Sequence, residues 1–466
     1  MHEKLTCPTF DWYIENVPKI MIKNLFILLV SASCLFSCTQ AKEKTSVKKP
    51  NIVLIMADDM GYECVSAYGS QEYNTPRLDK MAAEGVKFNH AYSQPLCTPT
   101  RVKIMTGKSN VRNYEYFGYL NPNQKTFGNL LQDAGYKTLI AGKWQLNGIY
   151  HDLRGNQDKS RPQHFGFDEY CLWQLTRNKQ FGERFADPFI EQNGKEIRLN
   201  GDYGPDVFRN YIMNFIERNQ DSSFFVYYPM VLLHDPFVPT PDSKAWQDSS
   251  RRYEKDTAYF ADMVAYTDKI VGQLIDKLDE LSLLENTLVI FTGDNGTHPS
   301  IYTTMADGGV FRGGKGNTID AGNHVPFIAY WKGKAIGGKE IDDMIDFSDV
   351  LPTLLDAGNV PLQNFVTDGK SFLPALTDTS FQGNTYVYQH YNPRWGRWKE
   401  DSLHYIFNQE YKLYLNGQFY HTSQDSRENN PLTDQKLSGD EKAKKVALSK
   451  ALQKNIEIVT NKKTTL

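Results

Sequence analysis

The chain has 466 residues, of which 40% are hydrophobic and 13% aromatic, so it can bury a large core and is not an intrinsically disordered protein. Its 52 basic and 55 acidic residues leave a formal net charge of −3 without a basic stripe, which argues against a nucleic-acid partner. A site for an anion must therefore be built locally, from a few placed cations.

Residues 1–38 are predicted to be a targeting leader. A charged start at Met21 precedes an apolar stretch that ends at Ser37, and about 13 residues are too few for a bilayer span of roughly 20. We take residues 21–37 as a signal peptide and residues 1–20 as an over-extended start of the gene. The run Leu35-Phe36-Ser37-Cys38 is similar to a bacterial lipobox, which predicts lipidation at Cys38; the alternatives are Cys34 and a plain signal peptide.

Residues 39–49 are polar and basic, and we interpret them as a tether between the lipid and the folded body. The expected location is the periplasm or the outer membrane and cell surface, with membrane contact through the lipid anchor alone. The body holds Cys64, Cys97 and Cys171. An odd number of cysteines in an exported protein does not fit a disulfide framework and singles out one thiol for another role.

Apolar extended segments alternate with helical patterns along the body. Extended segments are expected over 51–57, 86–93, 137–141, 224–233 and 287–292, and helices over 76–85 and around 259–274, where apolar residues recur every three or four positions. This alternation predicts an α/β fold, a large mainly parallel sheet with helices on both faces. Polar residues repeatedly follow the strand ends, where such sheets bind their ligands.

The sequence pattern changes after about residue 360. Short aromatic-rich segments occur at 386–388, 404–407, 411–415 and 418–421, with a turn at Asn416-Gly417. We therefore divide the body into a catalytic domain over 50–360 and a smaller C-terminal subdomain over 361–466. The subdomain is predicted to be α+β, an antiparallel sheet backed by the helix near the C-terminus.

The segment Pro95-Leu96-Cys97-Thr98-Pro99-Thr100-Arg101 contains the most specific motif of the chain. Pro99 suits the first turn of a helix, which places Cys97 at the helix N-terminus, where free N–H groups favour anions. Arg101 follows one turn later on the same face. This is the C-x-P-x-R pattern, and the chain is identified as a member of the type I, formylglycine-dependent sulfatases of the alkaline phosphatase-like superfamily, here in the form of a bacterial lipoprotein sulfatase.

The resemblance implies a post-translational modification at Cys97. In the family this cysteine is oxidised to formylglycine, and the hydrated aldehyde is the nucleophile. A formylglycine-generating enzyme or an anaerobic sulfatase-maturating enzyme is therefore an expected partner. Arg101 is expected to hold the hydrate or its oxyanion.

Two acidic pairs follow apolar strands and indicate a metal site. Asp58-Asp59 ends the first extended segment and Asp294-Asn295 the fifth. Hard oxygen ligands, completed by an oxygen of modified Cys97, suit Ca²⁺, with Mg²⁺ as the alternative. The resemblance assigns metal ligation to the same positions.

Further site residues match the family pattern. Lys143 and Lys315 match its sulfate-contacting lysines, and His234 matches its histidine near the leaving group. Gln145 stands where the family usually has a histidine, and an amide cannot donate a proton as an acid. We assign Gln145 and His298 to substrate binding.

A second departure from the family lies at Asp320-Ala321-Gly322-Asn323-His324-Val325-Pro326. The family commonly has Glu-Gly-Gly there, with an arginine before Val-Pro, in a loop that approaches the substrate. Subsite contacts therefore cannot be carried over to this chain. The resemblance otherwise extends from about Pro50 to Leu432.

The sequence predicts a sulfatase that hydrolyses a sulfate ester, most plausibly on a sulfated carbohydrate. One alternative is a phosphonate monoester or phosphodiester hydrolase of the same superfamily. The other is a catalytically degenerate, glycan-binding lipoprotein, suggested by Gln145 and the altered Asp320 loop. The segment from Tyr391 to Trp398 combines aromatic rings with arginines, which suits an acidic sugar or is simply an aromatic surface loop.

Overall fold

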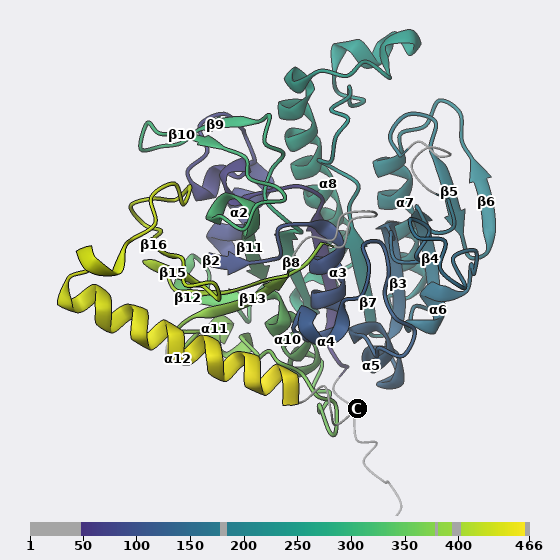
Figure 1. Cartoon of the computed structure of the whole chain (residues 1–466). Coiled ribbons are helices and arrows are strands. Elements are labelled where there is room, and N and C mark those ends of the chain that lie inside the picture. The colour runs from purple at the N-terminus through teal and green to yellow at the C-terminus, as the bar shows by residue number, and fades with distance from the viewer. Residues whose placement is uncertain (1–47, 178–183, 378–380, 394–401, 462–466) are drawn as a thin grey trace, which may run out of the picture. The chain divides into compact units, whose positions relative to one another are not determined.

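The computed structural model describes residues 48–177, 184–377, 381–393 and 402–461 (Figure 1). The predicted leader with Cys38, and all but the last two residues of the predicted tether, lie outside the described residues. Among the helices that are described, none is both long and apolar enough to cross a membrane.

A ten-stranded sheet forms the centre of the body, in the order β12-β2-β11-β8-β1-β7-β3-β4-β5-β6. The central strands β8, β1, β7, β3 and β4 run parallel to one another, whereas β11, β5 and β6 pair antiparallel. The predicted mainly parallel sheet is therefore confirmed, and the carboxyl ends of its central strands meet at one edge. The bounds are β1 (Asn51–Ala57), β2 (Val86–Tyr92), β3 (Lys137–Lys143), β4 (Glu169–Trp173), β5 (Phe189–Gln192), β6 (Lys195–Arg198), β7 (Phe224–Pro229), β8 (Thr287–Gly293), β11 (His324–Tyr330) and β12 (Lys339–Asp346).

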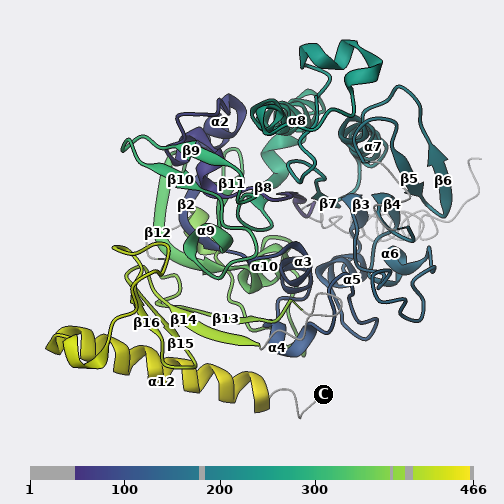
Figure 2. The same cartoon turned by 45° about the horizontal axis from the view of Figure 1, so that its top comes forward.

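Helices cover both faces of this sheet, as the alternating pattern predicts (Figure 2). Val53 and Ile55 of β1 belong to the core under α2, α7 and α8, whereas Ile52 and Leu54 belong to the core under α3, α5 and α10. Successive side chains of a strand point to opposite faces, so one apolar run serves both cores. The bounds are α2 (Pro76–Glu84), α3 (Cys97–Thr106), α5 (Phe127–Asp133), α7 (Gly204–Arg218), α8 (Phe260–Glu280) and α10 (Val350–Ala357), with short helices α4 (Asn110–Asn113), α6 (Arg161–His164), α9 (Asp320–Asn323) and α11 (Leu373–Thr377).

The fourth predicted strand is too long at its carboxyl end. β7 stops at Pro229, and residues 230–233 form a buried loop. This loop is apolar because it is packed inside, and an apolar run does not distinguish a buried loop from a strand. Its backbone binds the end of β1, since Asp58 N donates to Leu232 O and Leu233 N donates to Asp58 O, both at 2.6 Å.

A second sheet lies at the C-terminal end and is antiparallel, as predicted. One face packs Tyr405 and Tyr414 against Tyr92 and Met344 of the large sheet. The other face is covered by α12 (Gly439–Asn461), the long yellow helix of Figure 1. The strands are β13 (Val387–Tyr391), β14 (Leu403–Phe407), β15 (Tyr411–Tyr414) and β16 (Phe419–His421), and a separate hairpin consists of β9 (Tyr302–Thr304) and β10 (Val310–Arg312).

Candidate active site

The two acidic pairs meet at the carboxyl edge of the sheet. β1 and β8 are parallel neighbours, with Ala57 opposite Gly293, so the residues that follow them are adjacent. Asp59 N donates to Asp294 Oδ1 at 2.9 Å, and Asn295 Nδ2 donates to Asp59 Oδ1 at 2.9 Å. The four side chains of these pairs are fully buried, and buried carboxylates need compensating charge.

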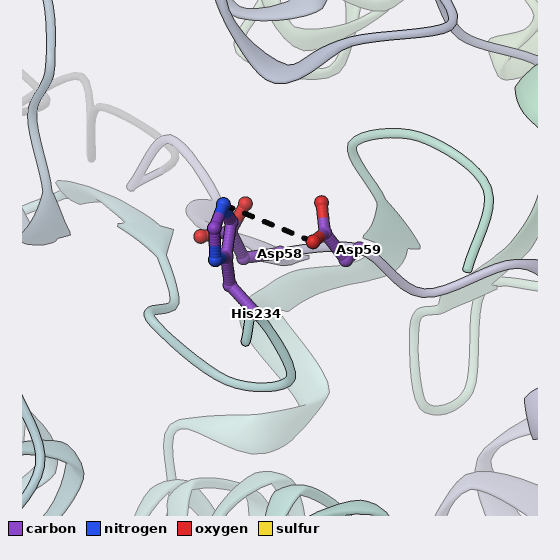
Figure 3. Close-up of side chains that lie close together, drawn as sticks. All are labelled: Asp58, Asp59 and His234. Atoms are coloured by element: carbon purple, nitrogen blue, oxygen red, sulfur yellow. Dashed lines mark ion pairs between the residues drawn. The ribbon is translucent and has the colours of Figure 1, made fainter. Parts of the chain in front are cut away.

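Cys97 joins this cluster from the first position of α3. Ligand atoms of Asp58, Cys97 and Asp294 all lie within 4.8 Å of one another, and the same holds for Asp58, Asp59 and His234, drawn in Figure 3. These residues come from a stretch of more than 230 positions, from Asp58 to Asp294, so the fold brings the predicted ligands and nucleophile together.

The donor set fits a hard divalent cation. Three carboxylates and the Asn295 amide offer oxygen, and Asn295 Oδ1 is buried without a hydrogen-bond partner. A buried carbonyl oxygen without a partner costs free energy that a cation would recover. The four acidic-pair side chains offer oxygen alone, which favours Ca²⁺ or Mg²⁺ over zinc as long as the His234 nitrogen and the Cys97 sulfur are not ligands.

Three cationic side chains compensate the carboxylates one for one. Lys143 Nζ lies 2.7 Å from Asp58 Oδ2 and Lys315 Nζ 2.5 Å from Asp59 Oδ2. Arg101 Nη2 donates to Asp294 Oδ2 at 2.9 Å, and its Nη1 donates to Lys143 O. Arg101 is therefore anchored in the acidic cluster, one turn from Cys97 as expected.

The electrostatic consequences differ between the two central carboxylates. Burial alone would raise the pKa of Asp58, but Lys143, His234 and Arg101 hold it well below its usual range. Burial and the neighbouring Asp58 raise the pKa of Asp294 to about 7. Burial also raises the pKa of the Cys97 thiol, so an unmodified cysteine would be a poor nucleophile here.

His234 lies in the loop after β7, with both ring nitrogens in contact with neighbours. Lys315 Nζ is 3.1 Å from Nε2, and Arg184 Nη2 is 3.0 Å from Nδ1. The Asp235 carboxylate also lies 3.0 Å from Nδ1, and Asp59 lies 3.9 Å from Nε2 (dashed line in Figure 3). Burial lowers the pKa of His234, and this effect exceeds the attraction of the Asp59 carboxylate, which would raise the pKa. The imidazole is therefore favoured in its neutral form, which can exchange a proton.

A cavity of about 320 Å³ opens onto this cluster. The predicted residues Cys97, Lys143, Gln145, His234, His298 and Lys315 line it, while the four acidic-pair residues and Arg101 lie behind its wall. Sequence reasoning missed the other lining residues, which are Leu96, Phe117, Tyr150, Trp173, Gln174, Arg184, Asp235 and Pro299. Gln174 follows β4 at the carboxyl edge and could have been found by the strand-end rule, whereas no sequence signal marks Arg184.

The Asp320 loop lines a second cavity and not the one beside Cys97. Asp320 and His324 line a separate cavity of about 260 Å³ between the large sheet and the second sheet. The aromatic and arginine-rich segment that begins at Tyr391 is largely outside the described residues, from residue 394 onward. Tyr391 itself donates to Gly316 O at 3.1 Å, beside Lys315.

A sheet with these parallel central strands, and with acidic and cationic groups at their carboxyl edge, defines an alkaline phosphatase-like fold. Solved structures share it. Ps i-CgsB superimposes with a TM-score of 0.70 at 25% identity, over 87% of this chain and 92% of that chain. A protein solved in complex with its substrate D-glucosamine-2-N,6-O-disulfate has a TM-score of 0.69 at 22% sequence identity, over 89% of this chain and 99% of that chain. The phosphonate monoester hydrolase of Agrobacterium radiobacter has a TM-score of 0.65 at 17% sequence identity, over 88% of this chain and 96% of that chain.

The Sulfatase family model matches residues 50–360, well over half of the chain, and the chain therefore belongs to the sulfatase family. N-acetylgalactosamine-6-sulfatase of Canis lupus familiaris is 32% identical over an alignment of 362 positions that covers 70% of this chain and 66% of the relative. Arylsulfatase A of Homo sapiens is 31% identical over 363 aligned positions that cover 71% of this chain and 68% of the relative. The chain thus spans about two thirds of the length of these curated relatives.

Proposed function

We propose that this protein is a sulfuric ester hydrolase that removes sulfate from a sulfated carbohydrate, with formylglycine made from Cys97 as its nucleophile and Ca²⁺, or alternatively Mg²⁺, as its metal. The observation that carries the proposal is the convergence of Cys97 with Asp58 and Asp294 within 4.8 Å, beside a cavity lined by Lys143 and Lys315. The sulfatase relatives and the solved structure with a sulfated sugar support the substrate class.

The charge balance of the cluster suits an anionic ester. Three carboxylates face three cations, so a bound divalent ion would leave an excess of positive charge at the cavity. That excess attracts a sulfate monoester and stabilises the negative charge that grows on its oxygens as the S–O bond breaks. The ion itself would supply Lewis-acid polarisation of the ester.

Each cavity residue then has a defined task. The hydrated formylglycine at position 97 would supply the attacking hydroxyl, at the N-terminus of α3. Lys143 and Lys315 bind the ester oxygens, and Arg101 keeps Asp294 and the start of α3 in register. His234 passes a proton to the oxygen of the leaving alcohol. Gln145 cannot do this because an amide is not an acid.

Peptide mass and activity of one preparation test the proposal. The peptide with Cys97, taken from protein matured in a competent host, should be about 18 Da lighter than its thiol form. Cys97→Ser should give at most a single turnover of a sulfate ester, because its sulfated product lacks the second hydroxyl that expels sulfate. Cys171→Ala, which changes a buried cysteine of β4 away from the cavity, should retain activity. Sustained turnover by Cys97→Ser would contradict the mechanism.

The phosphonate monoester hydrolase is the second candidate function, favoured by the fold shared with the Agrobacterium radiobacter enzyme. A sulfate ester and a phosphodiester assayed on the same preparation separate the two. A fully unmodified Cys97 thiol in the native host, with no turnover of either ester, would instead support a degenerate glycan-binding protein.

We further propose that the protein is an exported lipoprotein, anchored through Cys38 and matured by a formylglycine-generating or anaerobic sulfatase-maturating enzyme. The lipobox-like run before Cys38 supports the anchor. Metabolic labelling with a fatty acid should mark the wild type and not Cys38→Ala, and Cys38→Ala should move from the membrane fraction to the soluble one. Equal labelling of both would exclude Cys38 as the anchor.

A further inference from the structure

Two glutamines with an unusual backbone conformation sit side by side on the cavity wall. Gln145 and Gln174 follow the parallel neighbours β3 and β4, and Gln145 N donates to Gln174 O at 3.2 Å. Both have a left-handed backbone, with φ of 61° and 62°. This conformation is costly for a residue other than glycine and persists at positions where the surrounding structure imposes it, often at functional sites.

Each of these two lining residues has a side-chain acceptor without a partner. Both amide nitrogens point to the same hydroxyl, since Gln174 Nε2 lies 2.5 Å and Gln145 Nε2 3.5 Å from Tyr150 Oη. Gln145 and Gln174 are 4% and 5% exposed, and the Oε1 atom of each is buried without a hydrogen-bond partner. Buried acceptors are nearly always satisfied, so this pair is matched to donors that a ligand brings.

Arg184 places a cation on the same wall. It is 5% exposed, and none of the ion pairs found among the described residues includes it. Its Nη2 donates to His234 Nδ1 and to the carbonyls of His234 and Asp235, while its Nε has no partner. The guanidinium lies 4.8 Å from the ring centroid of Trp173, which fixes its plane.

The position of Arg184 separates it from the ester site. Lys315 contacts Nε2 of the His234 ring and Arg184 contacts Nδ1, so the imidazole lies between the two cations. A sulfate held by Lys143 and Lys315 therefore leaves Arg184 free for another group. Asp58 and Asp235 attract the buried guanidinium of Arg184, but neither forms an ion pair with it, and an anionic ligand group would offset more of its burial cost.

We propose that Gln145, Gln174 and Arg184 form a specificity subsite for a second acidic group of the sugar and its neighbouring hydroxyls. The preferred substrate is then a carbohydrate that carries a carboxylate or a second sulfate in addition to the ester that is cleaved. Arg184 binds this second anion, and the two glutamine oxygens accept hydrogen bonds from hydroxyl or amide N–H groups. The inference rests on the proposed function and deepens it.

Arg184→Gln tests the subsite with four substrates on the matured, metal-loaded enzyme. They are an aryl sulfate, a sulfated neutral sugar, a sulfated sugar linked to a uronic acid, and a disulfated sugar. We expect kcat/KM to fall about 10- to 100-fold on at least one of the two diacidic substrates, because a charge-assisted hydrogen bond is lost. The aryl sulfate and the neutral sugar should change by less than about threefold. Which diacidic substrate is affected distinguishes a carboxylate from a second sulfate.

Arg177→Gln is the matched control, because Arg177 is 39% exposed at its side chain, pairs with Glu196 and does not line the cavity. Its substrate profile should equal that of the wild type. An equal loss on all four substrates by Arg184→Gln would overturn the proposal and make Arg184 a structural or ester-binding residue. If that variant does not fold, the wild type decides, since it must prefer a diacidic substrate over the neutral sugar by about tenfold or more.

The two proposals fail in different ways. A wild type that cleaves the neutral and diacidic sugars equally well overturns the subsite and leaves the sulfatase intact. A wild type that cleaves none of the four sulfate esters overturns the proposed function itself.

Discussion

At the scale of single residues, the groups at the ends of β1 and β8 and the residues of the cavity wall differ in their sequence context. The metal-site and nucleophile positions could be predicted because each carries a motif or ends an apolar strand, as Asp58 and Asp294 do. Gln174 and Arg184 carry no such pattern. Gln174 reaches the cavity wall through its left-handed backbone conformation, and Arg184 through the loop between β4 and β5, whose path no local sequence pattern predicts.

Metal removal should destabilise the protein measurably. At the ends of β1 and β8, burial and the like charge of Asp58 raise the pKa of Asp294 to about 7. A divalent ion that binds only the folded state should raise the melting temperature by about 3 °C or more when it is in large excess. Differential scanning calorimetry with added Ca²⁺ against a chelator measures the shift.

Asp294→Asn is the control for that measurement. Its amide retains one oxygen but removes a negative charge, so the response of the melting temperature to Ca²⁺ should shrink strongly. A response of the same size in this variant would place the stabilising ion elsewhere.

At the scale of elements, the junction of α9 and β11 places Asp320 and His324 at the cavity between the large sheet and the second sheet. His324 Nδ1 lies 3.2 Å from the Asp320 carboxylate, and its ring lies against Tyr62 and Tyr92. Here the family's usual glutamate and arginine are replaced by a titratable pair.

Strand existence was predictable from apolar runs, but the end of β7 was not, because buried loop and strand share the same composition.

This pair should make stability depend on pH. Burial lowers the pKa of His324, but the stronger combined attraction of Asp320 and Asn89 O raises it above its ordinary value. A raised folded pKa contributes stability below about pH 6.5 that is lost as pH rises through the folded value. The free energy of unfolding should therefore fall on the alkaline side of pH 6.5. Stacked His90, whose pKa burial lowers, acts in the opposite sense below pH 6.5. Glu63 adds to the attraction on His324, and because burial raises its own pKa to about 7, it also lowers stability as pH rises towards 7.

Urea unfolding at pH 6, 7 and 8 measures this slope. His324→Gln should flatten it between pH 7 and 8, whereas His164→Gln, on the exposed helix α6, should leave it unchanged. An unchanged slope in His324→Gln would show that other groups set the pH dependence.

At the scale of the whole molecule, strand order lies beyond what local patterns determine. β2 follows β1 in the chain yet pairs with β11 and β12, across more than 230 positions of sequence. Periodicity predicts that a strand exists and which residues it buries, but pairing depends on contacts that form only in the folded chain. The second sheet was easier, because its short strands follow one another and pair in sequence order.

Stability of the second sheet should depend on α12. Leu448 and Leu452 are 4% and 2% exposed and pack against Ile406 and Phe419. Leu452→Ala should lower the free energy of unfolding by about 2–5 kcal/mol through lost burial and the cavity left behind. Val446→Ala, at an exposed position of the same helix, should cost far less. Equal effects on chemical denaturation would mean that α12 contributes little to the core.

The loop that carries Lys315 is held from outside the large sheet. Tyr391 donates to Gly316 O, and Tyr414 and Lys412 bind Thr318 through its hydroxyl and its carbonyl. During synthesis these anchors leave the ribosome after the nucleophile and both acidic pairs. A nascent chain that ends before residue 387 would therefore contain Cys97 and the acidic pairs but lack the contacts that hold the Lys315 loop.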